Sequence, residues 1–124
     1  MIQTKSPKLA IVRDSYATGK PVEWVQVHKL PEYAHFNHSA HLTAGVGCVS
    51  CHGRIDQMKV VGQQKPLSMG WCLECHRNPY PSLVPKNQVT NLAFDALSAG
   101  YNPHKDPNRL REVNPPQHCS GCHY

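Results

Sequence analysis

The first thirty residues contain two segments whose apolar and polar positions predict an element. Residues 6–18 have a Pro in their first turn and are followed by Gly-Lys-Pro at 19–21, which predicts one short helix. Residues 22–30 alternate apolar and polar side chains and predict an extended strand that ends at Pro31. Both elements are short, and neither would bury a large surface.

A second short helix is expected at residues 37–44. Asn37 or Ser39 can cap its first turn, because both side chains can accept a hydrogen bond from a free backbone N–H. Gly45 and Gly47 can end the helix, since glycine readily adopts the left-handed conformation that closes many helices.

The rest of the chain has no long periodic segment. Residues 55–61 predict a short strand or one arm of a hairpin, and residues 91–99 predict a short helix. The Pro-rich residues 78–91 predict a loop, and residues 102–117 predict an irregular stretch. We therefore expect a small, mostly irregular fold with short helices and a minor β hairpin.

Composition indicates that side chains alone do not build the core of this fold. The 124 residues fit one domain, which we place at residues 22–124, with residues 1–21 as a polar lead-in. Apolar residues make up 40% of the chain, but that count includes six Cys, and only two Phe and two Trp are present. A chain with so few large apolar side chains normally needs disulfides, a metal or a cofactor to fold.

Charge and hydropathy argue against two classes of protein. The formal net charge is +5, but the 13 Lys and Arg residues are scattered without a basic run, which favours a solvated surface over a nucleic-acid interface. No apolar run reaches the about 18 residues that a membrane helix needs, so we expect no membrane span. The N-terminus also lacks the apolar core of a secretory signal.

One pentapeptide pattern occurs three times. The sequences CVSCH, CLECH and CSGCH stand at residues 48–52, 72–76 and 119–123, and they share only C-x-x-C-H. In every copy a His follows the second Cys directly. This repeat is the most informative feature of the sequence, and its chemistry decides the function.

Three chemistries use C-x-x-C pairs. A four-cysteine zinc site could join the first two copies, but it would leave the third pair without a partner and would not explain the His. A redox dithiol would need one active pair near a βαβ pattern, whereas three pairs are present. Covalent haem explains every position, because two thiols add to the vinyl groups of one porphyrin and the next His binds the iron.

The sequence therefore predicts three haem c groups. Porphyrins would fill much of the interior, which accounts for the shortage of large apolar side chains. Their six propionates would offset the positive charge, so the main support for a nucleic-acid partner is removed. The predicted thioether cysteines are Cys48, Cys51, Cys72, Cys75, Cys119 and Cys122, and the predicted proximal iron ligands are His52, His76 and His123.

Each iron has a second axial position, and its ligand decides the function. A second strong ligand makes an electron carrier, whereas an open position permits catalysis. His38 and His41 lie three residues apart on a predicted helix, so they share a face and would serve two different haems. His28, in the strand-like sequence VQVHKLP, is the third predicted distal ligand. Less favoured candidates are His104, His35, His118 and Met69.

The pattern F-x-H-x-x-H followed by C-x-x-C-H resembles the small class III multihaem cytochromes. This resemblance implies a fold organised around its haems. It also implies that His38 ligates the haem on Cys48 and Cys51. His41 would then ligate the haem on Cys119 and Cys122.

A more specific resemblance covers residues 22–124. The strings VEWVQVHKLPEYAHFNHSAH, CVSCHGRIDQMKVV, PLSMGWCLECHRNP and HCSGCHY are similar to the C-terminal three-haem part of the multihaem cytochrome c subunit of alternative complex III. That family of quinol-oxidising complexes is related to molybdopterin oxidoreductases. The resemblance implies that His28 ligates the haem on Cys72 and Cys75.

The same resemblance implies partners and a location. The expected partners are an iron–sulfur or molybdopterin-type subunit and a downstream cytochrome c or copper protein. The expected location is the periplasm or the outer face of the cytoplasmic membrane.

Together these patterns predict a protein that relays single electrons through three covalent haems. We expect it to be a subunit of a membrane-associated quinol:acceptor oxidoreductase in a respiratory or photosynthetic chain, without a catalytic site of its own. Two alternatives are open at this point: a standalone periplasmic three-haem carrier, and a multihaem redox enzyme with one open haem.

Overall fold

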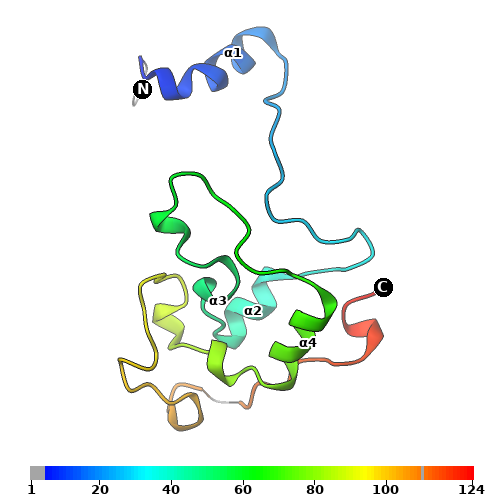
Figure 1. Ribbon diagram of the computed structural model, residues 1–124, viewed down its shortest axis with the longest axis vertical. Coiled ribbons are helices and arrows are strands. Elements are labelled where there is room, and N and C mark those ends of the chain that lie inside the picture. The colour runs from blue at the N-terminus through cyan, green and yellow to red at the C-terminus, as the bar shows by residue number, and fades with distance from the viewer. Residues whose placement is uncertain (1–4, 110) are drawn as a thin grey trace.

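The computed structural model describes residues 5–109 and 111–124. Short helices are joined by long irregular segments, and α2, α3 and α4 lie close together in one body (Figure 1). Helix α1 lies at the opposite end of the molecule, and a long single stretch of chain connects it to that body (Figure 1).

The N-terminal helix is present where the sequence predicts it. A 3-10 turn at Pro7–Leu9 leads into α1 at Ala10–Thr18, and Gly19 ends the helix with φ of 70°. The strand predicted at 22–30 is wrong, because this segment pairs with no other strand. Alternation of apolar and polar positions does not by itself provide a neighbour for the backbone hydrogen bonds of a strand.

Helix α2 spans His38–Ala44 and confirms the second prediction. The Oδ1 atom of Asn37 accepts a hydrogen bond from the backbone N–H of Ser39 at 2.9 Å, which identifies Asn37 as the cap. Gly45 ends the helix in the left-handed conformation, with φ of 86°. Helix α2 therefore begins and ends at residues whose chemistry is evident in the sequence.

Two further helices coincide with the first two C-x-x-C-H motifs and were not predicted. Helix α3 spans Cys48–His52, and helix α4 spans Met69–Arg77. The side chain of Ser68 caps α4 by accepting a hydrogen bond from the backbone N–H of Trp71 at 3.3 Å. Neither helix is long enough to show a clear helical period in the sequence.

The predicted hairpin arm and the predicted third helix are both wrong. Residues 55–61 contain a 3-10 turn at Ile55–Gln57 instead of a strand, and residues 91–99 form a series of turns. In the latter segment the Asp95 carboxylate accepts hydrogen bonds from the backbone N–H of Leu97 and the hydroxyl of Ser98. Such local bonds compete with the helical ladder.

The remaining ordered turns are short. The loop predicted at 78–91 contains 3-10 turns at Tyr80–Ser82 and Lys86–Gln88, and the irregular stretch at 102–117 contains one at Pro103–Lys105. Across the described residues, the β structure consists of one isolated antiparallel bridge between Val46 and Leu83, so no hairpin is present.

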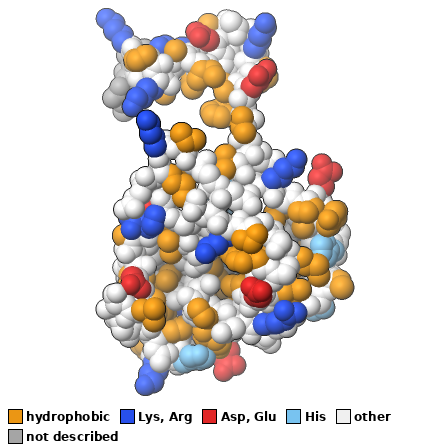
Figure 2. Space-filling view, viewed as in Figure 1, with side chains coloured by type: hydrophobic (Ala, Val, Ile, Leu, Met, Phe, Trp, Pro, Cys, Tyr) orange, Lys and Arg blue, Asp and Glu red, His pale blue; other side chains and the backbone are white. Residues whose placement is uncertain are grey.

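The buried core is very small. Among the described residues, the buried aliphatic side chains are Leu83, Val84 and Val89. Large apolar side chains such as Trp24 and Val60 are each 82% exposed. Figure 2 shows hydrophobic side chains at the surface of both the body and the α1 end, with Lys and Arg scattered among them. So small a core supports the expectation that a cofactor completes the interior.

Across the described residues, we find no helix with the length and apolar character that crossing a membrane requires.

Candidate functional site

The first two C-x-x-C-H motifs place their reactive side chains on helices. In α3 and in α4 the second Cys lies three residues after the first Cys, and the His lies four residues after it. The three side chains therefore share one face of the helix. The backbone N–H of Cys48 donates to the carbonyl of Val89 at 2.9 Å. The N–H of Gly47 donates to the carbonyl of Ser82 at 3.0 Å. The first motif is therefore fixed to the loop that follows the second.

The third motif lies in a 3-10 turn at Cys119–Gly121 and is held by the segment that precedes α2. The backbone N–H of His35 donates to the carbonyl of Cys122 at 2.8 Å. The Nδ1 atom of His123 lies 2.7 Å from the carbonyl oxygen of Tyr33. The C-terminal motif is thus joined to the chain three residues before the start of the helix that carries His38.

All six cysteines are free thiols, and several of them lie near one another. Burial raises the pKa of the Cys51 thiol, and the thiols of Cys75, Cys72 and Cys48 raise it further. Burial also raises the pKa of Cys72, with a further contribution from Cys122. The thiols of Cys51 and Cys72 therefore carry protons at neutral pH, and the cysteines of different motifs are close enough to affect one another.

The arrangement does not support a zinc site. Within residues 5–109 and 111–124, no group of three or more His, Cys, Asp or Glu side chains is arranged to hold a metal ion. A four-cysteine site built from the first two motifs would be such a group.

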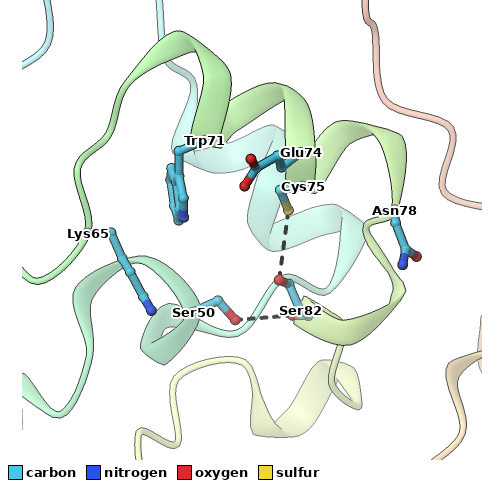
Figure 3. A pocket seen from close by; sticks show the side chains of 7 residues that line it. All are labelled: Ser50, Lys65, Trp71, Glu74, Cys75, Asn78 and Ser82. Carbon is cyan, nitrogen blue, oxygen red and sulfur yellow. Dashed lines mark hydrogen bonds between the residues drawn. The ribbon is translucent and has the colours of Figure 1, made fainter.

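An open hollow of about 410 Å³ lies beside the second motif, between α3 and α4 (Figure 3). Trp71, Glu74 and Cys75 line it from α4, and Ser50 and Lys65 lie across from them (Figure 3). The thiol of Cys75 is therefore accessible from this hollow. A thiol that opens onto a hollow can be reached by the vinyl group of a porphyrin, which fits the predicted role of Cys75.

Three of the predicted iron ligands have their tautomer fixed by a backbone carbonyl. A carbonyl oxygen only accepts, so the Nδ1 atom of each ring must carry the proton and Nε2 keeps a free lone pair. This is the usual preparation of a metal-binding imidazole, whose second nitrogen donates to a neighbouring acceptor. The Nδ1–oxygen distances are 2.8 Å from His41 to Asn37, 2.6 Å from His76 to Pro116 and 2.7 Å from His123 to Tyr33.

Helix α2 places one histidine ring across from each of the first two motif histidines. The ring centroids of His38 and His52 are 6.3 Å apart, and those of His41 and His76 are 6.1 Å apart. Two imidazoles that bind one metal ion from opposite sides have centroids separated by about this distance, because each metal–nitrogen bond spans about 2 Å and each ring centroid lies a further ångström or so behind its nitrogen. Both ring pairs therefore fit axial ligands of two separate irons.

Two pairings differ from those that the resemblances implied. His41 lies across from His76 of the second motif, whereas class III cytochromes implied His123. His28 lies next to His52 of the first motif, with 3.3 Å between its Nε2 and the Nδ1 of His52, whereas the second motif was expected. Both differences in pairing arise because tertiary packing brings together segments that are distant in sequence.

The less favoured ligand candidates lie in other surroundings. The ring of His35 stacks on Tyr124 with centroids 4.4 Å apart, and the ring of His104 stacks on Tyr80 with centroids 3.7 Å apart. The Nδ1 atom of His118 lies 3.0 Å from the hydroxyl of Ser120. Met69 begins α4 and is 63% exposed.

Arg109 supports the site and was not anticipated from the sequence. Its Nη1 donates to the carbonyl of Ala44 at the end of α2 at 2.6 Å. Its Nη2 donates to the carbonyl of Val84 at 3.4 Å and to the hydroxyl of Tyr101 at 3.3 Å. The guanidinium therefore fixes the C-terminus of the helix that carries His38 and His41. Its partners are backbone carbonyls and a hydroxyl, which no sequence motif reveals.

Comparison with known proteins supports the haem interpretation. The family model for cytochrome c7 and related cytochrome c matches residues 34–124, which include α2 and all three C-x-x-C-H motifs. No curated relative matches the chain. Proteins of the matched family carry covalently bound c-type haem and transfer electrons, and the paired histidines and prepared Nε2 atoms fit that cofactor. The chain belongs to the family of cytochrome c7 and related cytochromes c, and is a multihaem electron-transfer protein.

Proposed function

We propose that this cytochrome carries three haem c groups and relays single electrons as a subunit of a membrane-associated quinol:acceptor oxidoreductase similar to alternative complex III. The observation that carries this proposal is that two histidine rings of helix α2 each lie about 6 Å, between ring centroids, from the histidine ring of a different motif. When bound, haem accepts and releases one electron at its iron.

In this proposal each motif has a covalent and a coordinating part. The cysteine pairs hold the three porphyrins, and His52, His76 and His123 bind the irons on the proximal side. His38 and His41 bind two of the irons on the distal side. Two strong ligands on each of these two irons would leave no open site for a substrate, and α2 would act as the shared support of two neighbouring haems.

The proposed setting is the periplasm or the outer face of the cytoplasmic membrane. The proposed partners are an iron–sulfur or molybdopterin-type subunit as electron donor and a cytochrome c or copper protein as acceptor. The support is the similarity of the segments between the motifs, such as PLSMGWCLECHRNP, to the cytochrome subunit of that complex.

Two measurements test this function. A pyridine haemochrome assay with intact mass should give three haem c per chain, and a stoichiometry of zinc without haem would refute the cytochrome assignment. Purification of the tagged chain from its native membranes should recover iron–sulfur and molybdopterin-type subunits with quinol-oxidising activity. Recovery of the haem-loaded chain alone from the periplasmic fraction would instead identify a standalone carrier.

A further inference from the structure

His28 contacts the first motif at the Nδ1 atom of His52. This is the nitrogen that stays free when a motif histidine binds iron through Nε2. The Nε2 atom of His28 lies 3.3 Å from Nδ1 of His52, and the two rings are nearly perpendicular, with an interplanar angle of 80°. His38 is placed differently, with its ring nearly parallel to that of His52 and its centroid 6.3 Å away. The two histidines therefore have different relations to the same proximal ligand.

The centroid separation also argues against His28 as an iron ligand in this motif. The rings of His28 and His52 are 4.5 Å apart, well below the separation of the two other ring pairs. Two imidazoles on opposite sides of an iron cannot approach so closely, because two metal–nitrogen bonds of about 2 Å and the distance from each nitrogen to its ring centroid must all fit between the centroids. The contact is instead that of a hydrogen bond between the two rings.

The Nδ1 atom of His52 has a different kind of hydrogen-bond partner from the Nδ1 atoms of the other predicted iron ligands. His41, His76 and His123 direct Nδ1 at backbone carbonyls, whereas His52 directs Nδ1 at a side chain. His28 is half-buried although its neighbours Gln26, Val27 and Lys29 are exposed, so this part of the segment turns one ring inward.

We infer that His28 is a positioning residue for the proximal ligand His52, and not an iron ligand. The Nε2 atom of His28 accepts the Nδ1–H of His52, which directs the Nε2 of His52 toward the haem on Cys48 and Cys51. The inference rests on the proposed function, since it concerns the environment of a bound haem. It also gives the contact between residues 22–30 and the body a role in the redox chemistry.

The contact has an electronic consequence. An acceptor at Nδ1–H makes the imidazole a stronger electron donor to its metal, which favours the oxidised form of the iron. Loss of the acceptor should therefore raise the reduction potential of one haem and leave its two axial ligands in place. Loss of an iron ligand would instead produce a high-spin haem.

The experiment uses the haem-loaded protein with three substitutions at one position. His28→Leu removes the acceptor, His28→Gln retains an acceptor oxygen, and His28→Met introduces a strong haem ligand. Val25→Ala, in the same segment and 86% exposed in the native protein, is the matched control. The measurements are the haem count, the spin state by electron paramagnetic resonance, and redox titration of all the haems.

We expect every variant to keep the haem count and the spin states of the native protein. One potential should rise in the Leu variant, return toward the native value in the Gln variant, and stay unchanged in the Val25→Ala control. A high-spin signal in the Leu variant that the native protein lacks, or the spectrum of a Met-ligated haem that appears only in the Met variant, would identify His28 as an iron ligand and overturn the inference.

Unchanged potentials in the Leu variant would overturn it as well. If the Leu variant does not mature, a Gln variant with a native spin state but a shifted potential would count against the hydrogen bond. Absence of haem from the native protein would refute the proposed function itself, so the two failures are distinguishable.

Discussion

The ring of His38 lies nearly parallel to the ring of His52, with an interplanar angle of 8° and centroids 6.3 Å apart, although the residues belong to different helices. One turn further along α2, the ring centroid of His41 lies 6.1 Å from that of His76, with the two rings tilted by 44°. A helix of seven residues therefore places its two histidine rings across from two motifs that are more than twenty residues apart in the sequence.

Removal of either distal candidate should open one haem. His38→Ala and His41→Ala should each produce one haem that binds carbon monoxide when reduced, and the double variant should produce two. The physical reason is that alanine leaves the iron without a sixth ligand. Thr43→Ala, on the exposed face of the same helix, is the control and should bind none beyond the native amount. Ligand binding that does not increase in the single variants would contradict the assignment.

The thioethers should account for every cysteine. Replacement of both Cys48 and Cys51 by Ala should lower the haem content from three groups per chain to two, because the first porphyrin then has no covalent attachment. Thiol titration of the unfolded protein should find none in the haem-loaded form and six in the form made without haem. Two reactive thiols in the haem-containing native protein would mean that one motif does not carry haem.

The haem-free protein should show thiols of unequal reactivity. Because the pKa values of Cys51 and Cys72 are raised by burial, a smaller fraction of each is thiolate at neutral pH, and the thiolate is the reactive form. Both thiols should be alkylated slowly at neutral pH. Their alkylation should become fast only at a pH above the pKa of an ordinary thiol. The exposed Cys119 should be modified first. Peptide mapping after timed alkylation measures the order. Equal rates in the folded protein would contradict the prediction, whereas in urea, where burial is lost, the rates should become similar.

The sequence was sufficient for the parts of the site that depend on local chemistry. The C-x-x-C-H pattern by itself indicates covalent attachment of haem. Asn37 and Gly45 mark the ends of α2, because capping depends on the chemistry of the capping residue itself. The same is true of the one-turn spacing of His38 and His41. These features need no knowledge of the rest of the fold.

The pairing of the site residues could not be obtained in this way. Which ring lies across from His41, and which acceptor holds His52, depend on contacts between segments brought together by packing. The carbonyl partners Asn37, Pro116 and Tyr33 are invisible to sequence motifs, because any residue has a carbonyl. The failed strand at 22–30 has a similar cause, since a strand exists only where another segment pairs with it.

Arg109 should stabilise the end of α2. Arg109→Met should lower the free energy of unfolding by about 1–3 kcal/mol, because the carbonyls of Ala44 and Val84 lose a charged donor in a partly buried place. Thermal unfolding of the haem-loaded protein measures the change. Arg111→Met removes an exposed charge close by and should change stability little. Equal effects of the two substitutions would show that the hydrogen bonds of Arg109 contribute nothing specific.

Gly121 should be required for the packing that connects the third motif with the second. A Cβ atom at this position would lie 2.6 Å from the Cβ of Pro116, whose carbonyl accepts the Nδ1–H of His76. Gly121→Ala should therefore displace Pro116, destabilise the protein by about 1–3 kcal/mol and shift the potential of the haem on the second motif.

The matched control is Gly70→Ala in α4, where an added Cβ meets nothing within 4 Å. This substitution should stabilise the protein by about 0.5–1 kcal/mol, since alanine loses less backbone freedom in a helix than glycine does. Redox titration and thermal unfolding of both variants test the pair. A native potential for every haem in Gly121→Ala would show that Pro116 can move without disturbing His76. The contact between Gly121 and Pro116 would then contribute to stability alone, and not to the potential of the haem on the second motif.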